Sequence, residues 1–176
     1  LVRSPDAPLF GVDVSLQKAR TVAFFSNPRA SFDLLNNSDP AIAPFVTATR
    51  NFLGDPTALT GGTAFSNRAV GLLHRPYFPD GEVSPVNGPL SRPLAEFNPL
   101  STGLQSALIF PDIKRHLFYV FNISPTDVQQ RCTTTPDAIP GQNRIENGIQ
   151  IFPGSVPIYR GTQLIGAIGI SGDGID

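Results

Sequence analysis

The chain has 176 residues, enough for one domain with a sizeable core, and 40% of them are hydrophobic while only 15% are charged. Its formal net charge of −1 gives no electrostatic reason to expect nucleic acid as a partner, and no apolar run has the roughly 18–20 residues that span a bilayer, so we expect no membrane insertion. Cys132 is the only cysteine, so no disulfide can form within the chain.

The first predicted helix covers Asp13–Ser26, with Asp13 or Ser15 as its cap and Asn27-Pro28 as its end. Apolar residues at a spacing of three to four positions form one stripe, which should pack this helix onto a sheet. The stripe consists of Val12, Leu16, Ala19 and Ala23, and Val22 widens it.

A second helix is predicted between Asp39 and Leu53 and ends at Gly54. Its apolar face holds Ile42, Phe45, Val46, Thr49 and Leu53. Pro44 lies just inside the first turn if Asp39 is the cap, so the regular helix begins either at Asp39 or at Pro44.

The middle of the chain, from Asp55 to Pro111, is dense in Gly, Pro, Asn and Ser. We expect ordered loops there, with short strands at the apolar runs Ala69–Leu73 and Leu104–Phe110. His116–Ile123 (HLFYVFNI) is predicted to be the strongest strand of the middle. Ser124-Pro-Thr-Asp127 then predicts the start of a short helix that ends near Cys132.

Six glycines lie in Gly154–Gly174, and the stretch predicts a hairpin, Ser155–Tyr159 and Thr162–Ile170, turning at Arg160-Gly161. A dinucleotide-binding fingerprint has its glycines after a strand, where they open a helix. Here Gly166 and Gly169 fall inside the second strand, which indicates that a helix or another strand packs very close. We therefore interpret these glycines as positions that allow close packing and not as a phosphate-binding loop.

Two blocks, VDVSLQKARTVAFFS (Val12–Ser26) and GSVPIYRGTQLIGAIGISGDGID (Gly154–Asp176), resemble the small haem-binding proteins typified by GlcG, HbpS and the C-terminal domain of PduO. The resemblance implies an α+β fold, with a profilin-like antiparallel sheet and packed helices, and assembly into homo-oligomers. We then expect one domain over residues 1–176, incomplete at both ends, with a long Pro/Gly-rich insertion at about 54–115. That insertion is similar to extended, exported relatives, which favours a periplasmic or secreted protein over a cytoplasmic one.

The resemblance also implies haem, or a related tetrapyrrole, as the ligand. In some relatives a histidine near the N-terminus ligates the metal, and we expect that region to be missing from this chain. The ligand residues that the sequence itself offers are His74, Arg75, Tyr77 and His116, with His74 as the metal ligand. The alternative for each histidine is a surface or hydrogen-bonded role.

Other motifs lack their partners. Ser15-Leu-Gln-Lys18 matches S-x-x-K, but the S-D-N and K-T-G of serine acyl enzymes do not occur, so a helix cap is the better interpretation. Asp173 and Asp176 do not fit a calcium loop. No catalytic residue is assigned, and a binding protein is favoured over an enzyme. The alternative function is a structural or assembly subunit that kept the fold and lost the ligand.

Overall fold

The computed structural model describes residues 1–78, 82, 86–128, 133, 135 and 144–172. Over these residues the chain combines five α-helices and one short 3-10 helix with a two-stranded antiparallel sheet, so the predicted α+β class is confirmed. None of the described helices is both long and apolar enough to cross a membrane. The elements are α1 (Gly11–Phe25), α2 (Ala30–Leu35), α3 (Ala43–Leu53), α4 (Asn67–Leu73), η1 (Leu94–Glu96), α5 (Gly103–Val120), β1 (Ser155–Arg160) and β2 (Gln163–Gly169).

The predicted hairpin is confirmed. β1 and β2 pair antiparallel, with Val156 opposite Ile168, and the chain turns at Gly161, whose φ is +60°. A turn of this kind suits glycine because an L side chain is strained at positive φ. The two strands are the whole of the sheet in the described part of the chain. The wider profilin-like sheet therefore stays a prediction.

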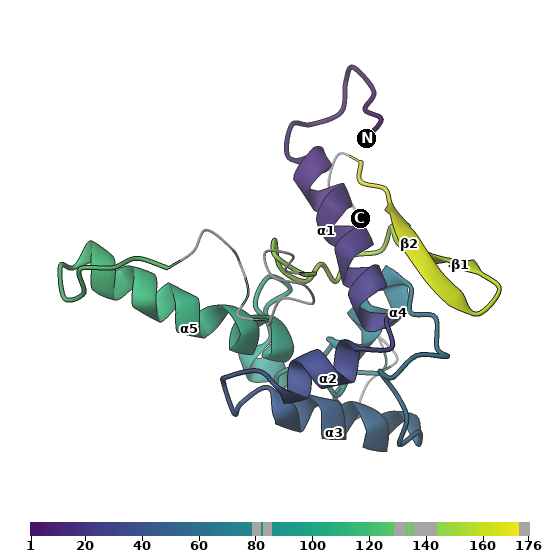
Figure 1. Cartoon of the computed structure of the whole chain (residues 1–176), viewed down its shortest axis with the longest axis horizontal. Helices are drawn as coiled ribbons and strands as arrows, with labels where there is room; N and C mark the ends of the chain where they lie inside the picture. Colours follow the sequence, from purple (N-terminus) through teal and green to yellow (C-terminus); the bar gives the residue numbers. More distant parts are fainter. Residues whose placement is uncertain (79–81, 83–85, 129–132, 134, 136–143, 173–176) are drawn as a thin grey trace.

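Helix α1 packs against the hairpin, and both run along the same side of the molecule (Figure 1). The predicted apolar stripe of α1 is only partly covered, because Leu16 is 41% exposed while Val22 is fully buried. The predicted side-chain cap is wrong: the helix begins at Gly11 with no side-chain cap, and the Ser15 hydroxyl donates to the carbonyl of Val12 at 2.8 Å.

Helix α3 confirms the second predicted helix. It begins at Ala43, with Pro44 in its first turn, and ends at Leu53, after which Gly54 forms the C-cap with a φ of +64°. Of the predicted apolar face, Ile42, Val46 and Thr49 are fully buried.

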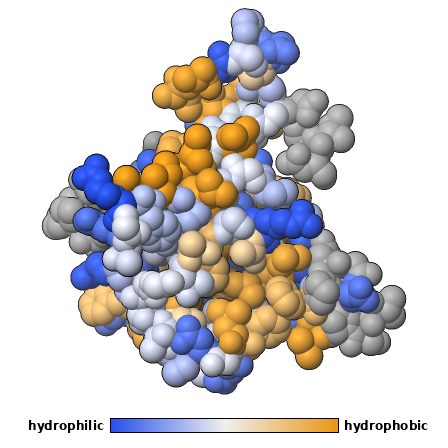
Figure 2. All heavy atoms as spheres, turned by 90° about the vertical axis from the view of Figure 1, so that its right-hand side faces the viewer, coloured by the Kyte–Doolittle hydropathy of each residue, from blue (hydrophilic) through white to orange (hydrophobic). Residues whose placement is uncertain are grey.

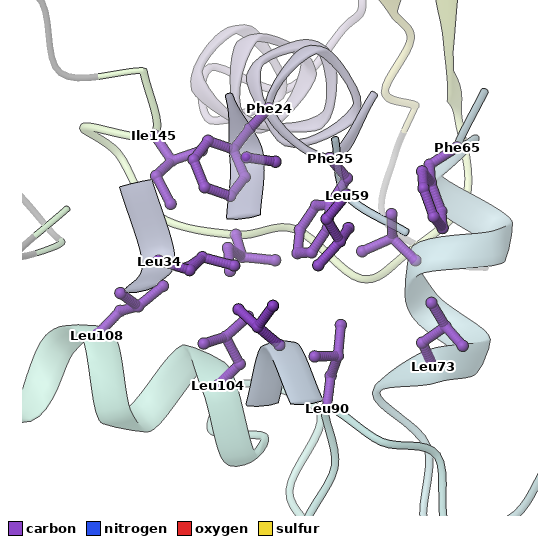
Figure 3. Packing of buried hydrophobic residues seen from close by; sticks show 14 of the residues in the cluster. Phe24, Phe25, Leu34, Leu59, Phe65, Leu73, Leu90, Leu104, Leu108 and Ile145 are labelled. Atoms are coloured by element: carbon purple, nitrogen blue, oxygen red, sulfur yellow. The ribbon is translucent and has the colours of Figure 1, made fainter. Parts of the chain in front are cut away.

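The hydrophobic core lies between α1, α4 and the first half of α5 (Figure 3). Phe24 and Phe25 of α1 meet edge to face, with their ring centroids 5.4 Å apart. Loops of the middle segment also supply core side chains, which explains how so much irregular backbone is ordered. The fully buried members are Phe24, Ala30, Leu34, Ile42, Val46, Val70, Leu90, Leu104, Leu108 and Ile145.

The strands predicted for the middle of the chain are wrong. Ala69–Leu73 lies within α4, and both Leu104–Phe110 and His116–Val120 lie within the single helix α5. A capping box starts α5, since the side-chain oxygen of Gln105 accepts from the backbone N–H of Thr102 at 2.9 Å. β-branched and aromatic residues favour strands only weakly. The capping box and the burial of Leu104 and Leu108 favour a helix more strongly than this preference favours a strand.

The helix predicted after Ser124 does not form over the described residues, because Ser124–Val128 is irregular. The Ser124 hydroxyl makes a local hydrogen bond instead of capping a helix, and it donates to the carbonyl of Thr126 at 3.0 Å. The rest of that predicted helix, with Cys132, lies outside the described residues, as do Asp173 and Asp176.

Candidate functional site

An open groove of about 540 Å³ lies at the free end of α5, the end that extends away from the core at the left of Figure 1. One wall is the last turns of α5 and the other is the segment that returns after the helix. The lining residues are Asp112, Arg115 and Phe118 from α5, and Ser124, Thr126, Asp127 and Val128 from the returning segment.

The local sequence explains why the chain returns at this point. Asn122 adopts the left-handed conformation, with φ +55°, and the backbone N–H of Ile123 donates to the carbonyl of Phe118 at 2.8 Å. This pattern closes a helix and reverses the chain, and asparagine is one of the few residues that tolerate it. The reversal brings Asp127 back beside α5.

His116 and Asp127 form the central contact of this site. The imidazole Nδ1 lies 2.8 Å from the carboxylate Oδ1, and the side chains are 53% and 36% exposed. The hydrogen bond from His116 lowers the pKa of Asp127, and the Val128 backbone N–H, which donates to the same oxygen at 2.7 Å, lowers that pKa further. With Nδ1–H donating to the carboxylate, the free lone pair of the ring is on Nε2.

Arg115 and Phe118 line the groove together with Asp127. The Arg115 guanidinium is exposed and lies 3.8 Å from the carboxylate of Asp112. The Lys114 ammonium lies 5.7 Å from the ring centroid of Phe118. The site therefore combines an oriented imidazole, an exposed guanidinium and a flat apolar ring.

Of the predicted ligand residues, His74 lies elsewhere, at the end of α4, and is fully buried. Its Nδ1 lies 2.7 Å from the carbonyl of Val70, and its ring meets Phe25 edge to face at 6.0 Å. Burial lowers its pKa to about 4, so the ring is neutral at neutral pH. This geometry agrees with the alternative that we gave for His74, a histidine hydrogen-bonded within the protein.

The neighbours of His74 are also packed within the protein. The Arg75 guanidinium lies 5.9 Å from the ring centroid of Phe97, and Tyr77 is half-buried. The structure thus separates the four predicted residues into two groups, His74 with Arg75 and Tyr77 in one and His116 in the other. The sequence prediction missed Asp127 and Phe118, since a strand at 116–123 does not bring the chain back past His116.

A second open groove, of about 620 Å³, lies between the N-terminal segment, α1 and β2. It is lined by residues 1–4, 7–8, 11–12, 15–16, 19 and 167–171, and of these only Arg3 has a charged side chain. Such a lining suits an apolar ligand but offers no imidazole to a metal. In the part of the chain that the structure describes, no three His, Cys, Asp or Glu residues form a group that could hold a metal ion by themselves.

The S-x-x-K pair lies in α1, where both side chains make structural contacts. Ser15 donates to the carbonyl of Val12, and the buried Lys18 ammonium donates to the carbonyl of Ile170 at 3.1 Å. Lys18 thereby ties α1 to the residue that follows β2.

Comparison with known families identifies the class of the C-terminal part of the chain. The family described as "Haem degrading protein HbpS-like" matches residues 104–176. This match confirms the resemblance to the HbpS-like family that the sequence predicts, and the matched residues include His116, the lining of the groove and the hairpin. The first of the two blocks that carry the resemblance, Val12–Ser26, lies outside the matched residues. No curated protein and no solved structure matches the chain.

Proposed function

We propose that this protein binds haem, or a related tetrapyrrole, at the groove at the free end of α5, where His116, which is hydrogen-bonded to the lining residue Asp127, would hold the metal. The observation that carries the proposal is the pair of His116 and Asp127, which lies inside the segment matched by a haem-related family. Binding is the requirement common to any haem-related role, including the degradation named in the family's description.

The residues of the groove fit the ligand chemically. Histidine ligands of metals commonly donate their second ring N–H to a carboxylate, which fixes the tautomer and makes the ligating nitrogen more basic. Asp127 supplies that carboxylate for His116. Haem iron would add the Lewis-acid centre for which an imidazole nitrogen is a common axial partner.

Two lining groups of the groove suit the rest of a tetrapyrrole. A guanidinium binds a carboxylate such as a propionate with two parallel hydrogen bonds, and Arg115 is exposed at the rim of the groove. Phe118 offers an aromatic face to the ring. Because the groove is open, it would hold one face or edge of the ring and leave the rest accessible.

The other predicted group is a weaker candidate. His74 would have to leave the core and give up its contact with Val70 before its ring could reach a ligand. The family match likewise gives no support to the alternative function, a structural subunit without a ligand, because the match names a haem-related class.

A titration with hemin tests the proposal. We expect the purified protein to shift and sharpen the Soret band of hemin at a stoichiometry of one, and we expect His116→Ala to weaken binding at least tenfold. Asp127→Asn should weaken it less, because Asp127 only positions the ring. A wild-type protein that leaves the Soret band unchanged would refute the proposed function.

A further inference from the structure

Another open groove, of about 400 Å³, lies between α4 and the hairpin, and we call it the α4 groove. Its apolar wall consists of Val156 from β1, Ile168 from β2 and Ile170, which follows β2. Val156 and Ile168 lie opposite each other in the pairing of the strands, so they are neighbours on one side of the hairpin. The three side chains are 51%, 50% and 67% exposed.

This wall lies on the side of the hairpin that faces away from α1. The backbone of Gly169 packs against α1, and successive residues of a strand alternate between its two sides. Ile168 and Ile170 flank Gly169, so their side chains lie on the opposite side. The packing of α1 therefore leaves the wall of the α4 groove open, with three branched aliphatic side chains and no aromatic ring in it.

Arg68 of α4 is the one charged residue in the lining of this groove. Among the residues that the structure describes, its side chain forms no ion pair and no hydrogen bond, whereas Arg115 pairs with Asp112. The stem of an arginine can lie along apolar surface while its guanidinium stays in water, where it binds a carboxylate with two parallel hydrogen bonds. The α4 groove thus offers an aliphatic wall and a cation to the same ligand.

Buried contacts hold the two sides of the α4 groove in place. Asn67, the neighbour of Arg68, is fully buried, and its side-chain nitrogen donates to the carbonyl of Gln150 at 2.6 Å. Gly71 of α4 lies so close to the carbonyl of Ile151 that a Cβ would not fit between them. Both contacts tie α4 to the segment that leads into β1. The groove is therefore formed before a ligand arrives, which lowers the entropic cost of binding.

We propose that the α4 groove binds an aliphatic monocarboxylate, with the hydrocarbon chain on the wall and the carboxylate on Arg68. The volume of the groove lies within the range of small-molecule sites, about 300–1,000 Å³. A stable protein partner would need roughly 800 Å² on each side, far more than three partly exposed side chains provide. A single cation in the lining favours a ligand with one carboxylate, such as a straight-chain fatty acid of medium length.

Isothermal titration calorimetry with decanoate tests this proposal. We expect saturable binding at a stoichiometry of one, with a dissociation constant on the order of 0.1–1 mM for so small a ligand. Decanoate should bind at least threefold more tightly than octanoate, because each methylene that is fully removed from water raises affinity by about fourfold. Decylammonium, which has the same chain and a positive head group, should bind at least tenfold more weakly than decanoate.

Three variants separate the two halves of the site. Arg68→Gln should weaken decanoate binding at least tenfold, because it removes the cation. Arg160→Gln is the matched control and should leave binding unchanged, since Arg160 is also exposed and has no partner among the described residues but lies outside the lining. Ile170→Ala should weaken decanoate at least twofold, because it shortens the wall.

Four outcomes would overturn the proposal. One is a wild type without saturable binding at about ten times the expected dissociation constant, and another is equal affinity for decanoate and decylammonium. The third is an Arg68→Gln variant, shown by circular dichroism to be folded, that keeps its affinity or loses no more than Arg160→Gln. The fourth is binding to phosphatidylglycerol vesicles that both arginine variants reduce equally, which would assign this side of the hairpin to a membrane surface.

The proposal does not depend on haem. Arg68→Gln should leave the affinity for hemin unchanged, and His116→Ala should leave the affinity for decanoate unchanged. Absence of decanoate binding with hemin binding intact would refute the further inference alone, and the reverse result would refute the proposed function alone.

Discussion

The backbone of Gly169 in β2 lies directly against the carbonyl oxygen of Ser15 in α1, with no room between them for a methyl group. A Cβ at position 169 would also lie 2.9 Å from the backbone nitrogen of Ala19. The helix and the hairpin thus meet backbone to backbone. Figure 2 shows the face that lies on the right-hand side of Figure 1, where hydrophobic side chains lie among polar ones. Gly169 therefore allows close packing, as the sequence indicates, whereas the same prediction for Gly166 is wrong, because a Cβ there would meet nothing within 4 Å.

The first prediction concerns this contact. Gly169→Val should destabilise the protein by about 1–3 kcal/mol, because the added side chain must push α1 away from β2. Thermal or urea unfolding measures the change. Gly166→Ala, in the same strand, is the matched control, since a Cβ there meets nothing within 4 Å. Equal stability of the two variants would contradict the close-packing role of Gly169.

The second prediction concerns Gln105, which joins the start of α5 to the C-terminal part of the chain. Its side-chain oxygen accepts from the Thr102 N–H, and its Nε2 donates to the carbonyl of Ile149 at 2.8 Å. Gln105→Ala should cost roughly 2–3 kcal/mol, because it removes these bonds and leaves buried polar groups unsatisfied. Urea unfolding measures the loss, and Ser106→Ala, one residue further along α5, should change stability by less than about 0.5 kcal/mol.

The third prediction is a pH dependence from His74. The pKa of His74 is about 4 in the folded protein, because burial disfavours the charged ring, and its ordinary value is 6.5. Below pH 6.5 the unfolded chain binds a proton at this residue and the folded protein does not. The stability that the neutral ring maintains is therefore complete above pH 6.5 and falls by about 1.4 kcal/mol per unit as the pH drops toward 4.

His74→Leu provides the control for this pH dependence. The two proteins share every other titrating group, so the difference between their unfolding free energies isolates His74. That difference should become more favourable to the variant at each step from pH 6.5 to pH 5. A difference that stays constant over this range would show that His74 is not held neutral in the core.

The sequence predicted a helix or strand well where the hydrophobic pattern and the residues that end the element agree. The periodic apolar residues and Pro28 marked α1, and the two β-type runs around Gly161 marked the hairpin. α5 failed because the run HLFYVFNI has the composition of a strand, while the features that make it a helix lie outside it. These are the capping box at Thr102 and Gln105 and the burial of Leu104 and Leu108, which depends on the rest of the core.

The candidate site could be predicted only in part, for the same reason. His116 was identifiable as one of two histidines, whereas its partner Asp127 lies eleven positions further on. Their contact requires α5 to end at Val120 and the chain to reverse at Asn122, and neither follows from a strand. His74 was favoured because it lies among Arg, Pro and Tyr, yet tertiary packing buried it against Phe25 and Val70.

The central claim is that the His116 Nε2 supplies the bond to the iron while the rest of the groove holds the ring. The most direct test compares the affinities of hemin and of metal-free protoporphyrin IX, which has the same ring and propionates but no iron, for the wild type and His116→Ala. Our account predicts that the variant loses at least tenfold in affinity for hemin and keeps its affinity for the metal-free ring. An equal change for both ligands, or an unchanged affinity for hemin, would contradict it.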